Sequence, residues 1–303
     1  MGMAMLKRFL DYVEIRTKIT STFAFLMSVA YLVYQKNQVK WGLTLLFFAA
    51  MFLFDLTTTA INNYIDTKNN HQTLQFKRRT ALVIIYALFL TGAGLGLHLA
   101  YRTDVVVLLA GGLCFLCGVF YTYGPVPISR MPLGEVLSGL FYGLLIPFII
   151  LYINLPTGTF LTLNLSMETI SLELRMIPLL GLLLLAVIPF CTTANIMLAN
   201  NICDLEKDIA VKRHTLPYYI GRKALPLFTG LYYICYAAVI IMVIMRILSP
   251  ICLLSLISII PVQKNIKCFL QKQEKATTFM MAIKNYIIIM GSVVLLIFIS
   301  AFF

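Results

Sequence analysis

The chain has 303 residues, of which 60% are hydrophobic and 12% are charged, and its formal net charge is +12. Its mean hydropathy is +0.91. This composition excludes a soluble globular protein and indicates a chain that crosses a lipid bilayer several times.

Largely apolar stretches of about 18 residues or more predict membrane-spanning helices. In chain order these stretches are 19–34, 41–61, 80–100, 104–122, 133–153, 176–199, 224–246, 249–263 and 282–303. The eighth is the weakest because its apolar core is short and carries proline at both ends, so eight spans with one re-entrant segment are the alternative. The sequence therefore predicts an all-α, polytopic membrane protein that forms a single domain over residues 1–303.

The basic residues are distributed unevenly between alternate loops. Most lysines and arginines lie in the N-terminal tail and after the second, fourth, sixth and eighth predicted spans. The positive-inside rule places these segments in the cytoplasm. We therefore expect a multi-pass protein of the cell membrane, with a cytoplasmic N-terminus and an outside C-terminus. The rule also accounts for the positive charge without a nucleic-acid partner.

A first polar motif, INNYIDTKNN at residues 61–70, follows the second predicted span. Its Asn62, Asp66 and Asn70 are spaced by four residues and so share one face of a helix. Asp55, seven residues before Asn62, shares that face inside an apolar run. An ionisable residue within a span costs roughly 2.5–3.5 kcal/mol on insertion scales and indicates a functional site. Its structural alternative is hydrogen bonding to a neighbouring helix or to the threonines at 57–59.

The pair Cys114 and Cys117 also lies inside an apolar run. No second pair and no histidine accompany it. We therefore interpret both cysteines as helix core rather than as metal ligands.

A second polar motif, NNICDLEKD at residues 200–208, follows the sixth predicted span. Its Asn200, Asp204 and Asp208 repeat the four-residue spacing, again on the more basic side of the membrane. Either motif alone is explained equally well as the solvated end of a helix. Because the pattern occurs twice on one side, we expect two polar ridges that face each other across a cavity.

The residue types in both motifs favour a magnesium–diphosphate site. Asp and Asn oxygen atoms, without nearby His or Cys, suit Mg²⁺ rather than zinc. Basic residues to hold the anion follow each motif. They are Lys68, Lys77, Arg78 and Arg79 after the first, and Lys207, Lys212, Arg213, Arg222 and Lys223 after the second. Since no P-loop or GxGxxG is present, a diphosphate beside an apolar cavity indicates an isoprenyl diphosphate.

These motifs resemble the intramembrane aromatic prenyltransferases of the UbiA type. That family has nine transmembrane helices around a central cavity, with Asp-rich motifs after the second and sixth. The stretches NNICDLEKDIAVKRHTLPYYIGRKA and YTYGPVPISRMPLGE are similar to the branch that prenylates 1,4-dihydroxy-2-naphthoate for menaquinone. Asn63 and Asn70 stand where the family commonly has Asp, so each removes one negative charge from the first motif.

The resemblance implies Mg²⁺-dependent transfer of a polyprenyl group from a polyprenyl diphosphate to dihydroxynaphthoate, with loss of CO₂. Metal ligands would be Asn62, Asp66, Asn70, Asp204 and Asp208, of which the three aspartates are catalytic. Diphosphate contacts would be Asn62, Lys68, Asn200, Lys212, Arg213 and Arg222. The acceptor and prenyl pocket would include Asp55, Tyr121, Tyr123, Glu135 and Tyr142.

Two alternatives remain open at this stage. The same reaction on another acceptor, such as 4-hydroxybenzoate, would use the same motifs. A transporter or a non-catalytic lipid-diphosphate-binding protein would also carry polar residues within its spans. Transporter sites lie near the midplane of the bilayer, whereas these ridges lie at one face, although Asp55 keeps that alternative open.

Overall fold

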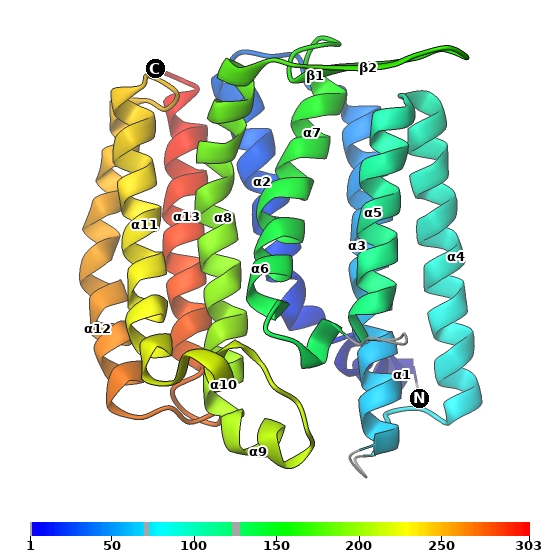
Figure 1. Ribbon diagram of the computed structural model, residues 1–303, viewed down its shortest axis with the longest axis vertical. Coiled ribbons are helices and arrows are strands. Elements are labelled where there is room, and N and C mark those ends of the chain that lie inside the picture. Colours follow the sequence, from blue (N-terminus) through cyan, green and yellow to red (C-terminus); the bar gives the residue numbers. More distant parts are fainter. Residues whose placement is uncertain (1, 70–72, 123–127) are drawn as a thin grey trace. The chain divides into compact units, whose positions relative to one another are not determined.

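The computed structural model describes residues 2–69, 73–122 and 128–303 (Figure 1). The chain divides into two compact units. The first unit contains residues 1–22 and 40–128, and the second contains residues 23–39 and 129–303. Helix α2 (Ile19–Tyr34) begins in the first unit and continues in the second.

Every element of regular structure in the described residues of the first unit is a helix. Its other elements are α1 (Gly2–Tyr12), η1 (Ile15–Lys18), α3 (Trp41–Asn69), α4 (Arg78–Arg102) and α5 (Val105–Thr122). Helix α3 packs along α4 and α5. The approach to α4 is close at Gly92, where an added Cβ would lie 3.4 Å from Leu53 Cβ. Small residues allow such close packing of membrane helices.

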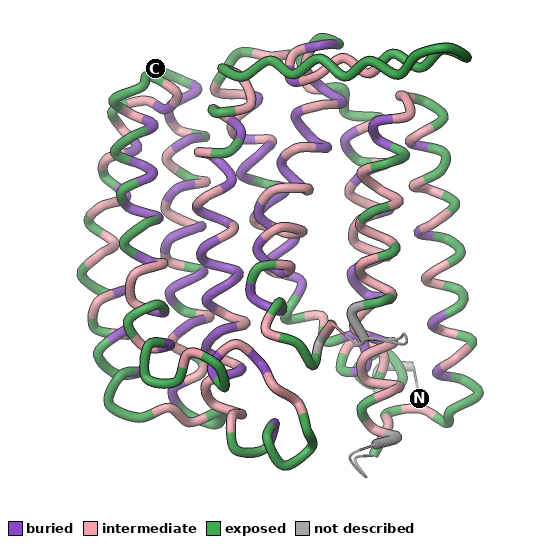
Figure 2. Tube along the Cα trace, viewed as in Figure 1, coloured by how far each residue is buried: buried purple, intermediate pink, exposed green. Residues whose placement is uncertain are grey.

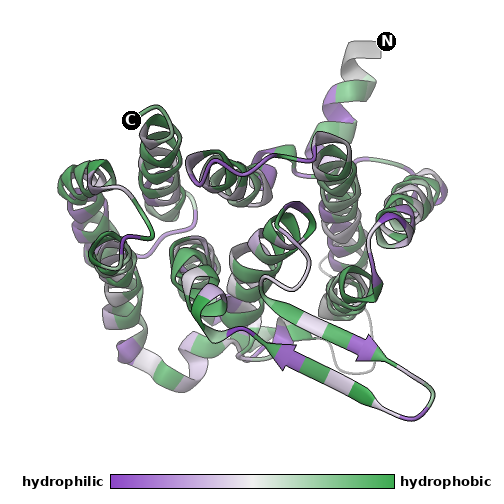
Figure 3. Ribbon diagram, turned by 90° about the horizontal axis from the view of Figure 1, so that it is seen from above, coloured by the Kyte–Doolittle hydropathy of each residue, from purple (hydrophilic) through white to green (hydrophobic). Residues whose placement is uncertain are grey.

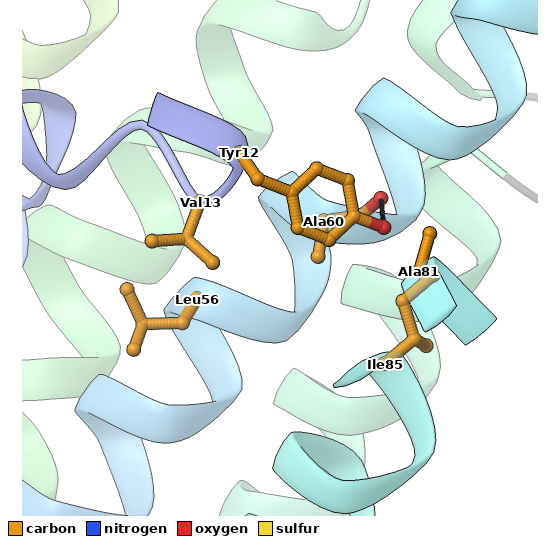
Figure 4. Packing of buried hydrophobic residues seen from close by; sticks show 6 residues of the cluster. All are labelled: Tyr12, Val13, Leu56, Ala60, Ala81 and Ile85. Atoms are coloured by element: carbon orange, nitrogen blue, oxygen red, sulfur yellow. Dashed lines mark hydrogen bonds between the residues drawn. The ribbon is translucent and has the colours of Figure 1, made fainter. Parts of the chain in front are cut away.

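A buried cluster joins the N-terminal segment to α3 and α4 (Figure 4). Its members are Tyr12, Val13, Leu56, Ala60, Ala81 and Ile85. The Tyr12 hydroxyl donates a hydrogen bond to the Ala60 carbonyl at 3.0 Å, and the Asn63 amide donates to the Tyr12 carbonyl at 2.9 Å. The N-terminal segment therefore packs against and hydrogen-bonds to α3 where the first polar motif begins.

The second unit is built around α8. Its elements are η2 (Ile128–Arg130), α6 (Gly134–Ser138), η3 (Gly139–Leu145), α7 (Ile146–Asn154), β1 (Leu161–Leu165), β2 (Ile170–Leu174), α8 (Met176–Cys203), α9 (Leu205–Ala210), α10 (Leu216–Ile220), η4 (Gly221–Lys223), α11 (Ala224–Ile244), η5 (Pro250–Ser258), α12 (Ile259–Gln271) and α13 (Met280–Ser300). Helix α8 packs against α6, η3, α11 and α13. Figure 2 shows the resulting buried positions along α8 and α13.

The element η3 is a π-helix that leads into Pro147. Pro147 has no amide N–H to donate to the carbonyl of Gly143, so the regular helical ladder is interrupted there. Gly143 itself lies so close to α8 that an added Cβ would collide with the backbone of Phe190. This approach joins the α6–η3–α7 span to α8.

Seven helices in the described part of the chain are long and apolar enough to cross a membrane. They are Trp41–Thr67, Arg78–Arg102, Gly134–Asn154, Met176–Cys203, Leu216–Ile244, Pro250–Gln271 and Met280–Ser300. The other two predicted spans coincide with shorter helices, the 16-residue α2 and the apolar Val105–Phe120. The predicted helical membrane fold is thus confirmed. The eighth span is longer than the expected 249–263, because η5 runs directly into α12.

A two-stranded hairpin joins α7 to α8, where the sequence predicted only a loop. Leu161 pairs with Leu174, Leu163 with Leu172, and Leu165 with Ile170, while polar residues form the alternate pairs. Figure 3 shows hydrophobic and more hydrophilic residues alternating along the two strands. Because side chains alternate across a strand, one face of the hairpin is apolar and the other is polar.

Candidate functional site

The second polar motif lies where α8 ends and α9 begins. Helix α8 ends at Cys203, and Asp204 joins it to α9 with φ −98° and ψ 5°. The motif is therefore not one continuous helix. Two backbone hydrogen bonds, from Asp204 to Asn200 at 3.0 Å and from Asp208 to Asp204 at 2.8 Å, nevertheless preserve the four-residue repeat across the break.

Asp204 is paired with a lysine that the sequence reasoning missed. Lys275 Nζ lies 2.6 Å from Asp204 Oδ2 and also donates a hydrogen bond to Asn200 Oδ1. Lys275 belongs to the segment between α12 and α13. The only sequence signal was its place in a basic loop on the predicted cytoplasmic side.

Asp208 is buried in α9, with Arg213 beside it. Arg213 Nε lies 3.8 Å from Asp208 Oδ2, a distance that allows electrostatic attraction but not a hydrogen bond. Within the described residues, Oδ2 therefore has no hydrogen-bond partner although it is buried. Burial raises the pKa of the Asp208 carboxyl, while the positive charges of Arg213 and Lys275 and the side chain of Thr215 oppose that rise. The Thr215 hydroxyl does not meet hydrogen-bond geometry with Oδ2.

Glu135 contacts the second motif through Asn201. Asn201 Nδ2 donates a hydrogen bond to Glu135 Oε1 at 2.9 Å, and both residues are buried. Glu135 Oε2 and Asn201 Oδ1 have no hydrogen-bond partner in the described part of the chain. The LGE segment singled out in the sequence thus reaches the motif itself and leaves polar atoms beside it without partners.

Lys212 follows α9 and Arg222 lies in η4, and both residues are exposed. Lys212 has φ 56°, in the left-handed region, where the chain turns after α9. Of the residues the structure describes, none forms an ion pair with either side chain. Both cations are therefore available to an anionic ligand.

The first motif lies at the end of α3, in the other unit. Asn62 is half-buried and Asp66 is exposed. The predicted residues Asn70 and Tyr123 lie outside the described residues, as do the side chains of Lys68 and Tyr121. In the second unit, Tyr142 is a half-buried residue of η3.

Asp55 is buried within the first unit and is fully engaged there. Lys18 Nζ lies 2.8 Å from Asp55 Oδ1, and the Ser21 hydroxyl donates to Asp55 Oδ2 at 2.7 Å. Lys18 also donates to the Asp55 carbonyl at 2.9 Å and to Thr59 Oγ1 at 2.5 Å. These contacts match the structural alternative for Asp55 and explain how a carboxylate is tolerated inside a span.

No group of three or more His, Cys, Asp or Glu side chains in the described ranges is arranged to hold a metal ion. Asp204 and Asp208 alone do not complete a magnesium coordination shell. Mg²⁺ commonly keeps several waters and uses phosphate oxygens beside one or two carboxylates. The buried, unpartnered Asp208 Oδ2 fits a ligand of that kind.

Residues 23–288 match the UbiA prenyltransferase family, and the chain belongs to that family. Over 245 residues it is 26% identical to 1,4-dihydroxy-2-naphthoate octaprenyltransferase of Bacillus subtilis (strain 168), covering 76% of this chain and 72% of that protein.

Solved structures share the fold. A UbiA homologue from Aeropyrum pernix K1 aligns with a TM-score of 0.65 at 17% identity, covering 92% of this chain and 98% of that one. A UbiA homologue from Archaeoglobus fulgidus bound to GPP and Mg²⁺ aligns with a TM-score of 0.60 at 15% identity, covering 98% and 100%. The family and the seven apolar helices identify a multi-pass membrane protein of the prenyltransferase class.

Proposed function

We propose that this protein transfers a polyprenyl group from a polyprenyl diphosphate to 1,4-dihydroxy-2-naphthoate. The observation that carries the proposal is the pair Asp204 and Asp208 at the end of a membrane span, each beside a cation of the same chain. The Bacillus subtilis relative and the KRHTLP and YTYGPVP stretches support dihydroxynaphthoate as the acceptor. Family membership favours an enzyme over the transporter alternative.

Mg²⁺ is the proposed cofactor, held by Asp204, Asp208 and Asn200. The first motif is proposed to add Asn62, Asp66 and Asn70 from its sequence pattern alone. When bound, the metal neutralises the diphosphate and stabilises the departing pyrophosphate. The Archaeoglobus fulgidus homologue bound to GPP and Mg²⁺ supports both the metal and the class of substrate.

The basic residues after α9 are proposed to hold the diphosphate. Arg213 is half-buried beside Asp208, while Lys212 and Arg222 are exposed. Hydrogen bonds from cationic groups to phosphate are strong, and they favour the state in which negative charge develops on the leaving group. Lys212 and Arg222 break no ion pair in the described chain when they bind it.

In the proposed reaction, the bond between the allylic carbon and the diphosphate oxygen breaks and pyrophosphate leaves. The ring carbon that bears the carboxylate attacks the allylic carbon, and the carboxylate then departs as CO₂. The products are prenylated naphthoquinol, CO₂ and pyrophosphate. A site within the bilayer protects the allylic cation from water. Glu135 and Tyr142 are proposed to line the acceptor and prenyl pocket.

The test is a transfer assay with purified protein, radiolabelled prenyl diphosphates of several lengths and Mg²⁺. Dihydroxynaphthoate and 4-hydroxybenzoate are supplied separately as acceptors. We expect a prenylated product with dihydroxynaphthoate, none with EDTA and none from Asp204→Ala. Product with 4-hydroxybenzoate alone would contradict the acceptor. No product with either acceptor, together with no Mg²⁺-dependent diphosphate binding, would contradict the function.

A further inference from the structure

Lys275 is held in a defined position by the turn that precedes α13. The Glu274 carboxylate accepts a hydrogen bond from the Thr277 hydroxyl at 2.9 Å. Its ion pair with Lys272, at 2.7 Å, is exposed and contributes little to the stability of the turn. The Glu274 carbonyl accepts the Phe279 amide at 3.0 Å. Lys275 Nζ lies 4.9 Å from the centre of the Phe279 ring. The turn fixes the backbone around Lys275, and the Phe279 ring lies against its ammonium group.

That ammonium group donates hydrogen bonds to two oxygen atoms of the second motif. It contacts Asp204 Oδ2 and Asn200 Oδ1, two residues to which the proposed function assigns the metal. Its positive charge also acts on Asp208. A divalent cation bound to the same oxygens would be repelled by the ammonium at this distance. Lysine and metal therefore compete for Asp204.

We propose that Lys275 is an internal counter-ion of the metal site that moves from Asp204 to a phosphate oxygen when metal and prenyl diphosphate bind. The inference rests on the proposed function. It assigns a diphosphate contact to a residue 71 positions from Asp204 in the sequence.

The exposure of the pair favours such an exchange. The Lys275 side chain is 40% exposed, and the Asp204 side chain is 21% exposed. Exposed ion pairs contribute little stability, so this contact is readily exchanged. Lysine carries its charge on a flexible four-carbon chain, which allows the ammonium to follow a new acceptor. A phosphate oxygen beside the metal provides one.

Lys275 is expected to affect metal binding and diphosphate binding in opposite directions, so the two effects can be measured separately. Without diphosphate, Lys275 competes with the metal and weakens its binding. With metal already bound, the same charge attracts the diphosphate and strengthens its binding. A purely structural lysine would support both ligands, and an uninvolved surface lysine would affect neither.

The test uses Lys275→Met, which retains the length of the side chain and removes its charge. Mn²⁺ binding to the metal-free protein is measured by electron paramagnetic resonance, and pyrophosphate binding is then measured at saturating Mn²⁺. We expect Mn²⁺ to bind about two- to fivefold more tightly, as expected for loss of an exposed ion pair. Pyrophosphate should bind about tenfold more weakly, as expected for loss of a charged hydrogen bond.

Lys272→Met is the matched control, because it removes the same charge from the same turn but pairs with Glu274. It should change neither constant. Lys275→Gln repeats the test without charge if the Met variant does not fold. Unchanged constants, or weaker binding of both ligands, in the Lys275 variant would overturn the inference. Failure of the wild type to bind Mn²⁺ would instead contradict the proposed function.

Discussion

At the scale of single residues, Asp55 and Asp208 are both buried but differ in how their oxygen atoms are satisfied. Both carboxylate oxygens of Asp55 have a donor, from Lys18 or Ser21. Asp208 Oδ2 has none among the described residues. A satisfied buried carboxylate stabilises the arrangement of its neighbours, whereas an unsatisfied one is a candidate for ligand binding. We therefore propose a structural role for Asp55 and a metal-binding role for Asp208.

Removing one partner of the buried Lys18–Asp55 pair should strongly lower the free energy of unfolding of the first unit. Lys18→Met leaves an unpaired charge inside the protein, which typically costs about 3–5 kcal/mol. The double variant Lys18→Met/Asp55→Leu should recover most of that stability and retain prenyl transfer. Denaturant unfolding in detergent and the transfer assay provide the two measurements. A stable but inactive double variant would contradict the structural role and support a place for Asp55 in the substrate pocket.

Asp208→Asn should separate stability from activity. Because burial raises the pKa of the Asp208 carboxyl, the folded protein binds that proton more tightly than the unfolded chain does. In metal-free buffer, the wild type should therefore lose stability relative to Asp208→Asn as pH rises from about 4, the ordinary aspartate pKa, through the raised value.

Thermal melting across pH measures this difference, which should disappear below about pH 4. At neutral pH the Asn variant should melt at the same temperature as the wild type or higher. Its transfer rate should fall about a hundredfold or more through loss of leaving-group stabilisation. A variant that melts earlier than the wild type at neutral pH would show that the charge of Asp208 stabilises the fold.

At the scale of elements, the contact between η3 and α8 depends on Gly143. An added Cβ there would collide with the backbone of Phe190. Gly143→Ala should therefore destabilise the second unit by about 1–3 kcal/mol, as overpacking of a close contact does. Gly181→Ala is the control, since its Cβ would meet open space within the same α8. Comparable melting temperatures for the two variants would contradict the close approach.

The apolar runs predicted the helices because length and hydrophobicity suffice to specify a membrane span. They did not predict the hairpin, whose alternation lasts only five residues in each strand. The length of the eighth span was also underestimated. Its continuation as α12 carries Lys264 and Lys267, and charged residues mark the end of an apolar run in the sequence.

At the scale of the whole molecule, the composition of the second motif could be read from the sequence, but its partners could not. Asn201 and Glu135 are 66 residues apart, and Asp204 and Lys275 are 71 apart. Such pairs form only when α8 packs against α6 and the turn before α13 reaches the end of α8. One sequence without covariation does not specify which loop cation reaches a given carboxylate. The role of Asp55 was ambiguous for the same reason, because its partners Lys18 and Ser21 lie 37 and 34 residues away in the sequence.

The predicted topology is testable by chemical labelling. Glu168 lies in the hairpin before α8, and Glu206 lies in α9 after it. If α8 crosses the membrane, cysteines introduced at these two positions in a cysteine-free background should react with an impermeant thiol reagent from opposite sides. Glu206→Cys should react from the cytoplasmic side. Labelling of both from one side would contradict the assignment of α8 as a span.

The proposed reaction transfers a prenyl group to dihydroxynaphthoate at a site built on Asp204 and Asp208. The most direct measurement follows carboxyl-labelled dihydroxynaphthoate with prenyl diphosphate and Mg²⁺ in the presence of purified protein. We expect one labelled CO₂ to be released for each prenyl group transferred, and none from Asp204→Ala. A prenylated product that retains the label, or no release from the wild type, would contradict it.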